Sequence, residues 1–133
     1  MRGLYVILVD DDELMLRMLE PALAAMRTTP AVSAVVTASG PERALRLLAD
    51  APEGPLAIVT DFNLKAAQNG LDILRWAQKQ RPASVRILIS GYAAEQIGDV
   101  TAGGAAHAFV EKPLRLRDLI EEIERALARH AVV

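Results

Sequence analysis

Hydrophobic residues fall into short continuous runs separated by longer segments of mixed character. The short runs are apolar on both faces and mostly rich in β-branched residues, which is typical of strands inside a parallel sheet. They lie at residues 4–9, 32–36, 56–59, 85–89 and 106–110. Between and after them, apolar side chains recur every three or four positions, which predicts amphipathic helices. The pattern therefore predicts five strand-then-helix units.

The helical signal differs in strength from segment to segment. The clearest period covers residues 116–127, and a second helix is predicted over residues 13–26. An Ala-rich segment from about residue 93 to residue 101 predicts a weaker helix, which Gly103-Gly104 would end.

Capping signals mark the two remaining helices. Ser39 stands three residues before Glu42, so we expect a capping box to open a helix there. Asn69 is the expected cap of the next helix, which Pro82 closes.

Short links between strands and helices favour right-handed crossovers and a parallel sheet covered on both faces. The predicted fold class is therefore α/β, with a doubly wound five-stranded parallel sheet. The chain has 133 residues, of which 52% are hydrophobic, and this is enough for one core. We expect a single domain over residues 1–133.

Composition excludes several kinds of site. The chain has no cysteine, so disulfides, thiol catalysis and cysteine-ligated metal sites are impossible. Its 15 Lys and Arg against 17 Asp and Glu give a net charge of −2, which argues against nucleic-acid binding by a broad basic face. The apolar run at residues 4–9 is too short to cross a bilayer, so we expect a cytoplasmic protein that does not contact membranes.

Polar side chains gather where the predicted strands end, which is where open parallel α/β sheets bind ligands. They are Asp10, Asp11 and Asp12 after the first strand, Asp61 after the third, Ser90 at the end of the fourth and Lys112 after the fifth. Each has an ordinary structural explanation, and helix capping accounts for Asp12 and Glu13. Because four of five strand ends together give a complementary set, a functional site is favoured.

Three of these acids, Asp10, Asp11 and Asp61, would place like charges in one cleft. Two unit charges about 4 Å apart repel by roughly 4 kcal/mol at an intermediate effective dielectric constant. The cleft must therefore hold a proton or a cation, and oxygen ligands suit Mg²⁺. Beside a hydroxyl group and Lys112, such an ion would neutralise phosphoryl oxygens, which predicts phosphoryl chemistry.

This set of residues resembles the receiver domain of two-component response regulators, over essentially the whole chain. The matching motifs are Val9-Asp10-Asp11, Thr60-Asp61, Ile89-Ser90-Gly91 and Glu111-Lys112-Pro113. The resemblance implies a flavodoxin-like sheet with strand order 2-1-3-4-5. It also implies a cis peptide bond between Lys112 and Pro113.

The resemblance implies roles for the acidic residues. Asp61 would accept a phosphoryl group from a phosphohistidine on a partner kinase. Asp11, Asp61 and the backbone carbonyl of Asn63 would bind Mg²⁺ directly, and Asp10 would act through water.

A switch is implied as well. Ser90 would move to hydrogen-bond the aspartyl phosphate, and Lys112 would pair with it. Phe109 matches the rotating aromatic residue of the family, and its burial would remodel the face formed by the fourth helix, fifth strand and fifth helix.

Three features depart from the family pattern. The loop over residues 62–70 lacks the usual proline after Leu64 and is one residue longer than the commonest form. Phe109 lacks the hydroxyl group of the frequent tyrosine. Tyr92 is bulky and lies two residues past Ser90, so we expect it to slow attack of water on the phosphate.

The function implied is a phosphorylation-controlled signalling module. Its partners would be a sensor histidine kinase or phosphotransfer protein and a downstream protein target, with a phosphorylation-dependent dimer as a possible form. It would catalyse only its own phosphorylation and dephosphorylation, and would not be an enzyme acting on other substrates.

Two other functions stay open at this point. One is a phosphatase of the haloacid dehalogenase type with Asp10 as nucleophile, although 133 residues leave no room for a cap domain. The other is an interaction domain that keeps the fold without being phosphorylated. His107 and His130 have no further ligand at suitable spacing, so neither is assigned to a metal or a phosphorelay.

Overall fold

A computed structural model describes residues 3–91 and 102–130 of the chain. Five strands form one sheet: β1 (Leu4–Val9), β2 (Val32–Ala38), β3 (Leu56–Asp61), β4 (Val85–Ser90) and β5 (Ala108–Glu111). The strand order is β2-β1-β3-β4-β5, and every neighbouring pair is parallel. The predicted fold class and strand order are therefore confirmed.

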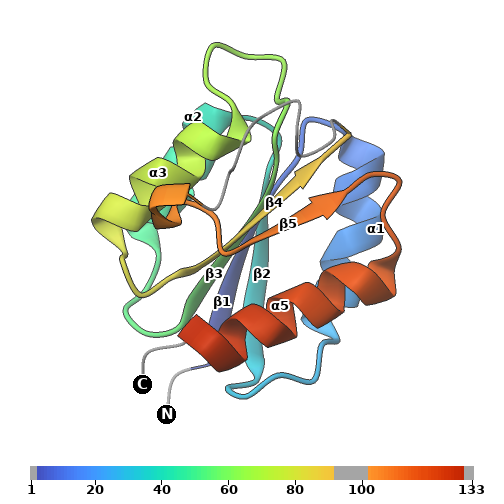
Figure 1. Cartoon of the computed structure of the whole chain (residues 1–133), viewed down its shortest axis with the longest axis vertical. Coiled ribbons are helices and arrows are strands. Elements are labelled where there is room, and N and C mark those ends of the chain that lie inside the picture. The colour runs from blue at the N-terminus through green and yellow to red at the C-terminus, as the bar shows by residue number, and fades with distance from the viewer. Residues whose placement is uncertain (1–2, 92–101, 131–133) are drawn as a thin grey trace.

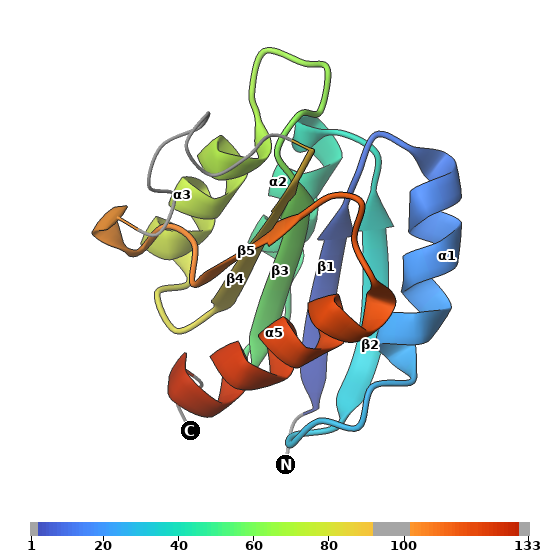
Figure 2. The same ribbon diagram turned by 45° about the vertical axis from the view of Figure 1, so that its right-hand side comes forward.

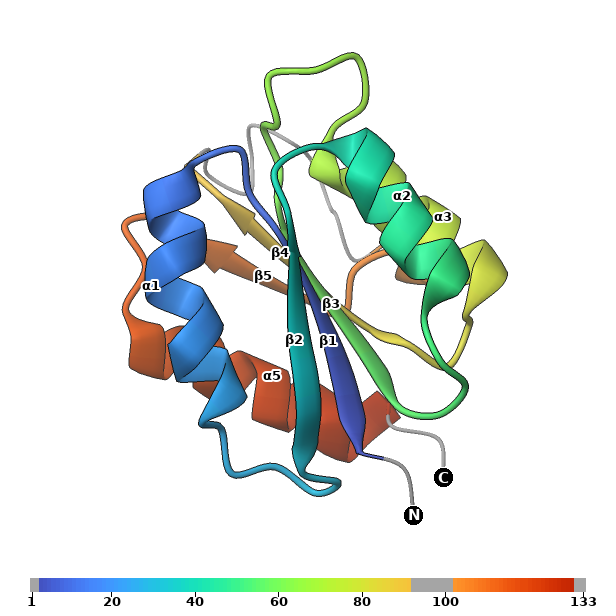
Figure 3. The ribbon, with the colours of Figure 1, turned by 180° about the vertical axis from the view of Figure 1, so that it is seen from behind.

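Helices cover both faces of this sheet. They are α1 (Glu13–Ala24), α2 (Pro41–Asp50), α3 (Gly70–Gln80) and α5 (Leu116–His130), with a short 3₁₀ helix η1 (Ala102–Gly104). Helices α1 and α5 lie against one face and α2 and α3 against the other, as Figure 1 shows and Figure 3 shows from behind. The helix predicted near residues 93–101 and the expectation for Tyr92 lie outside the described residues.

The sheet separates two hydrophobic clusters, because successive side chains of a strand point to opposite faces. In β1, Val6 and Leu8 pack with Leu19 of α1 and Ile123 of α5. On the other face, Ile7 belongs to the cluster that contains α3 residues. Full burial of each such side chain stabilises the fold by about 1.5–3 kcal/mol. Of the helices described, none is long and apolar enough to span a membrane.

Two of the predicted helix caps are confirmed and one is wrong. The Asp12 side chain accepts a hydrogen bond from the N–H of Leu14 at 3.0 Å at the start of α1. Asn69 caps α3 through a reciprocal capping box with Asp72.

The predicted capping box of Ser39 does not form, because Gly40 is the N-cap of α2 and makes no side-chain capping bond. Pro41 occupies the first helical position, where its fixed φ and missing N–H are tolerated. This places Ser39 one residue too early to cap the helix.

An arginine lies buried in β4, inside a run that the sequence pattern treats as apolar. Arg86 is only 3% exposed. Its guanidinium donates hydrogen bonds to the carbonyls of Ala105 at 2.9 Å, Gly104 at 2.8 Å and Ser84 at 3.0 Å. Gly104 has φ +79°, a conformation that favours glycine. Arg86 therefore fastens the segment that leads into β5 against β4.

His107 lies beside this arginine. Its Nδ1 accepts a hydrogen bond of 3.0 Å from the backbone N–H of Arg86, and its ring stacks on the ring of His130 with 4.0 Å between centroids. Burial lowers the pKa of His107 to about 4, with smaller electrostatic contributions from the neighbouring Arg86 and His130. The imidazole is thus held neutral at physiological pH.

We expect His107 to destabilise the fold in mild acid. Its pKa is about 4 in the folded state against 6.5 for an unperturbed histidine, so the unfolded chain binds more protons between these values. The contribution of His107 to the free energy of unfolding is therefore most favourable above pH 6.5 and falls as the pH falls toward 4. The whole difference between the two pKa values corresponds to a loss of about 3 kcal/mol in the free energy of unfolding. Because the ring is partly exposed, we expect a loss of about 1–2 kcal/mol.

Urea unfolding of the wild type and of His107→Gln at about pH 7 and pH 4.5 measures this contribution. Glutamine does not titrate but can still accept the hydrogen bond from Arg86. The carboxylates with raised pKa values, Asp10 and Asp61, change both proteins equally and in the opposite direction. Equal pH dependence in the two proteins would contradict the prediction.

Candidate functional site

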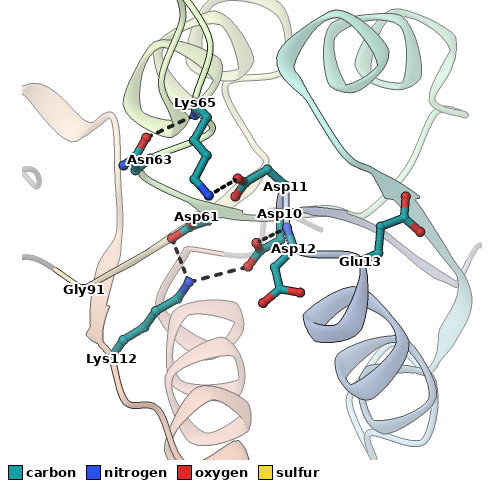
Figure 4. Close-up of a pocket in the computed structure, with 9 residues that line it drawn as sticks. All are labelled: Asp10, Asp11, Asp12, Glu13, Asp61, Asn63, Lys65, Gly91 and Lys112. Carbon is teal, nitrogen blue, oxygen red and sulfur yellow. Dashed lines mark hydrogen bonds and ion pairs between the residues drawn. The ribbon is translucent and has the colours of Figure 1, made fainter.

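A pocket opens at the carboxyl edge of the sheet, between the ends of β1, β3 and β5 (Figure 4). Its lining residues are Asp10, Asp11, Asp12, Glu13, Asp61, Asn63, Lys65, Gly91 and Lys112. Asp10, Asp11 and Asp61 each offer a carboxylate oxygen, and these oxygens all lie within 4.8 Å of one another. The structure thus brings together the three acids that the sequence predicts to share a cleft.

The pairing of β1 with β3 explains why these acids meet. Val9 lies opposite Thr60 in the parallel register. The next residue of each chain segment, Asp10 and Asp61, therefore emerges side by side at the same edge. Asp10 is 1% and Asp61 6% exposed, so both carboxylates are withdrawn from bulk water.

Helix α3 begins directly against the end of β3. The N–H of Gly70 donates a hydrogen bond of 2.8 Å to the carbonyl of Phe62. A Cβ at Gly70 would lie 2.1 Å from the backbone oxygen of Asp61, so only glycine fits there without displacing the strand. The intervening loop, residues 62–69, rises above the edge of the sheet in Figure 2 and carries two of the lining residues.

Lys112 enters the pocket from the end of β5. Its backbone N–H donates to the carbonyl of Ser90 at 2.7 Å, which places it beside the end of β4. Its Nζ lies 3.2 Å from an oxygen of Asp61 and 3.7 Å from one of Asp10. The peptide bond between Lys112 and Pro113 is cis, as the family resemblance implied.

Burial and mutual repulsion oppose ionisation of the acids. The pKa of Asp61 is raised by burial and by the charge of Asp11, while Lys112 partly offsets the rise. The pKa of Asp10 is raised by burial and by Asp61, although its carboxylate accepts a hydrogen bond of 2.9 Å from the N–H of Asp12. The pocket therefore favours an additional cation.

The same surroundings favour the charged form of Lys112. Burial lowers the pKa of its ammonium group, but the charges of Asp61 and Asp10 outweigh burial and raise the pKa above its usual value. Lys112 thus stays protonated and is held at the acids by two ion pairs.

The donor set fits a hard divalent cation. Three carboxylate oxygens converge, and carboxylate oxygens are preferred ligands of Mg²⁺. Five of the residues that line the pocket are acids and two are lysines, which leaves the pocket with a net negative charge. Electrostatics and ligand chemistry therefore both suit Mg²⁺.

The remaining predicted residues lie close to this pocket. Asn63 lines it, and its side-chain oxygen accepts a hydrogen bond of 3.1 Å from the N–H of Lys65. Ser90 is 1% exposed at the end of β4, and its neighbour Gly91 lines the pocket. Phe109 of β5 is partly buried against the cluster on the α2 and α3 side.

Sequence reasoning missed Lys65. Its Nζ lies 3.7 Å from a carboxylate oxygen of Asp11. The available signal was a basic residue directly after Leu64, within a loop that already departs from the family pattern. Spacing alone could not show that this side chain turns back over the acids.

Comparison with known proteins agrees with this geometry. Residues 6–124 match the family model described as response regulator receiver domain. No curated protein sequence matches the chain.

Solved structures show the same architecture. A CheY-like response regulator receiver domain protein from Methanospirillum hungatei JF-1 is 24% identical, with 97% of each chain covered and a TM-score of 0.81. A response regulator receiver domain protein from Clostridium thermocellum is 23% identical, with 94% of each chain covered and a TM-score of 0.79. The beryllofluoride-activated NtrC4 receiver domain dimer is 22% identical over 96% of this chain and 98% of that one, with a TM-score of 0.75.

Proposed function

Because the chain belongs to the response regulator receiver domain family, we propose that it accepts a phosphoryl group from a phosphohistidine in a Mg²⁺-dependent reaction. The observation that carries the proposal is the position of the Asp61 carboxylate. It lies 3.2 Å from Lys112 and within 4.8 Å of ligand oxygens of Asp10 and Asp11. A nucleophile, an ammonium group and two further acids thus share one pocket.

In the reaction, a carboxylate oxygen of Asp61 attacks the phosphorus atom. The new P–O bond forms as the P–N bond to the partner's imidazole breaks, and the imidazole nitrogen keeps the electron pair of that bond. Lys112 lies within reach of the transferred phosphoryl oxygens and balances part of their charge.

Mg²⁺, when bound, supplies positive charge that neutralises the phosphoryl oxygens. Asp11, Asp61 and the backbone carbonyl of Asn63 would hold it directly, and Asp10 would hold it through water. Since burial raises the pKa of Asp61, the nearby Lys112 helps to keep this carboxylate ionised and nucleophilic.

The response would be transmitted through β4 and β5. Ser90, at the end of β4, would hydrogen-bond the new phosphate. Phe109 pairs with Leu88 across the β4–β5 register and would change its burial as this edge rearranges. The surface so altered would bind a downstream protein target.

The partners follow from this chemistry. The donor would be a sensor histidine kinase or a phosphotransfer protein. An activated receiver domain dimer is described for NtrC4, so a phosphorylation-dependent dimer is one form the output could take. The domain would catalyse its own phosphorylation and dephosphorylation and would not turn over other substrates.

Mapping the modified residue tests the proposal. The protein is incubated with acetyl phosphate and Mg²⁺, the acyl phosphate is reduced with borohydride, and the modified peptide is sequenced by mass spectrometry. We expect one modification, at Asp61. Modification at Asp10 would favour the phosphatase, and no modification with either acetyl phosphate or phosphoramidate would favour a domain that is not phosphorylated.

A further inference from the structure

Lys65 reaches into the pocket from the loop after β3, on the side opposite Lys112 (Figure 4). Its Nζ lies 3.7 Å from Oδ2 of Asp11. Lys112 contacts Asp10 and Asp61. Each of the three clustered acids therefore has an ammonium group at ion-pair distance.

The two lysines are held very differently. The side chain of Lys112 is 26% exposed and bridges two carboxylates, whereas that of Lys65 is 79% exposed and contacts only Asp11 among the acids of the pocket. The Asp11 side chain is 22% exposed, but an ion pair whose ammonium group lies mostly in water is still weak, because water and salt screen it and because a long side chain loses rotamer freedom. Lys65 can therefore leave its carboxylate at little cost, and Lys112 cannot.

The backbone of the loop directs Lys65 toward the acids. Lys65 has φ +52°, a left-handed conformation that side chains other than glycine rarely adopt. Its N–H donates a hydrogen bond of 3.1 Å to Oδ1 of Asn63. This turn places the start of the Lys65 side chain above the pocket, and the side chain extends from there to Asp11.

We propose that Lys65 is a displaceable counter-ion that competes with Mg²⁺ for Asp11. The inference rests on the proposed function, because it assumes that Asp11 ligates the metal. The same carboxylate would serve both cations, and repulsion between Mg²⁺ and the ammonium group would weaken the ion pair of Lys65 with Asp11 when the metal is bound. Lys65 therefore lowers the affinity of the pocket for Mg²⁺ while it neutralises Asp11 in the metal-free protein.

Removing the charge should strengthen Mg²⁺ binding. We expect Lys65→Met to bind Mg²⁺ about two- to fivefold more tightly than the wild type in about 50 mM KCl, a range set by the energy of exposed ion pairs. Methionine keeps an unbranched side chain and the same backbone demand. Lys65→Arg keeps the charge and should stay within about twofold of the wild type.

Isothermal titration calorimetry with MgCl₂ measures these affinities without a phosphodonor. The difference between Lys65→Met and the wild type should shrink in about 0.5 M KCl, where the screening length is only a few ångströms. The role of Lys65 would be overturned if Lys65→Met bound Mg²⁺ as tightly as the wild type or more weakly. It would also be overturned if Lys65→Arg bound Mg²⁺ more tightly than the wild type to the same extent as Lys65→Met. If none of the three proteins binds Mg²⁺, the metal site in the proposed function fails instead.

Discussion

Asp61→Ala is expected to abolish Mg²⁺-dependent labelling by a phosphodonor. Alanine removes the oxygen that attacks phosphorus, and no neighbouring acid takes the same position relative to Lys112. Asp10, the other carboxylate in contact with Lys112, lies farther from its Nζ, at 3.7 Å against 3.2 Å. Labelling with radioactive acetyl phosphate, normalised to protein, should fall to background.

The substitution should leave the fold intact. Burial and repulsion raise the pKa of the Asp61 carboxyl, so its ionised form is unfavourable in the folded state and its loss should raise the free energy of unfolding near neutral pH. Urea unfolding checks this, and Asp50→Ala, at the exposed end of α2, is a matched control that should label normally. Persistent labelling of Asp61→Ala would show that another group accepts the phosphoryl.

Arg86→Met should destabilise the protein by about 3 kcal/mol or more. Methionine fills much of the space of the arginine stem but donates no hydrogen bond. The carbonyls of Ala105, Gly104 and Ser84 would each lose a donor. Since Arg86 is 3% exposed, water cannot readily replace it, and urea unfolding at neutral pH should show the loss.

Arg81 provides a control of the same type at the surface. Its guanidinium donates to three carbonyls, those of Ala51, Pro52 and Gly54, whereas that of Arg86 donates to four. Two of these bonds are exposed, so water can replace the guanidinium, and Arg81→Met should cost about 1 kcal/mol or less. If both variants lose the same stability, burial is not what makes Arg86 important.

Much of the fold could be predicted because burial on both faces leaves a simple pattern. The strands β1, β3 and β4 lie in the middle of the sheet, and each appears as an apolar run. Periodicity alone did not establish the strand order, which came from the family resemblance and is confirmed by the pairing. The capping box predicted at Ser39 is wrong because a capping motif and a proline at the first helical position indicate different starts for the same helix.

The acids of the site could be predicted because parallel strands bring their carboxyl ends to one edge. The positions and contacts of Lys65 and Arg86 could not be predicted in this way. The position of Lys65 depends on a left-handed backbone residue and a turn within an irregular loop. The carbonyl groups that Arg86 contacts belong to the backbone, and every residue has one. The residue types near Gly104 therefore do not indicate that a cation is buried there.

The close approach of Gly70 to the carbonyl of Asp61 constrains how a signal can spread. No space for a methyl group remains between them, so the first turn of α3 lies in direct contact with the end of β3. We expect this contact to oppose sliding of the helix along its strand when Asp61 carries a phosphoryl group. In that case α3 would serve as a fixed support, and displacement would be directed to β4 and β5.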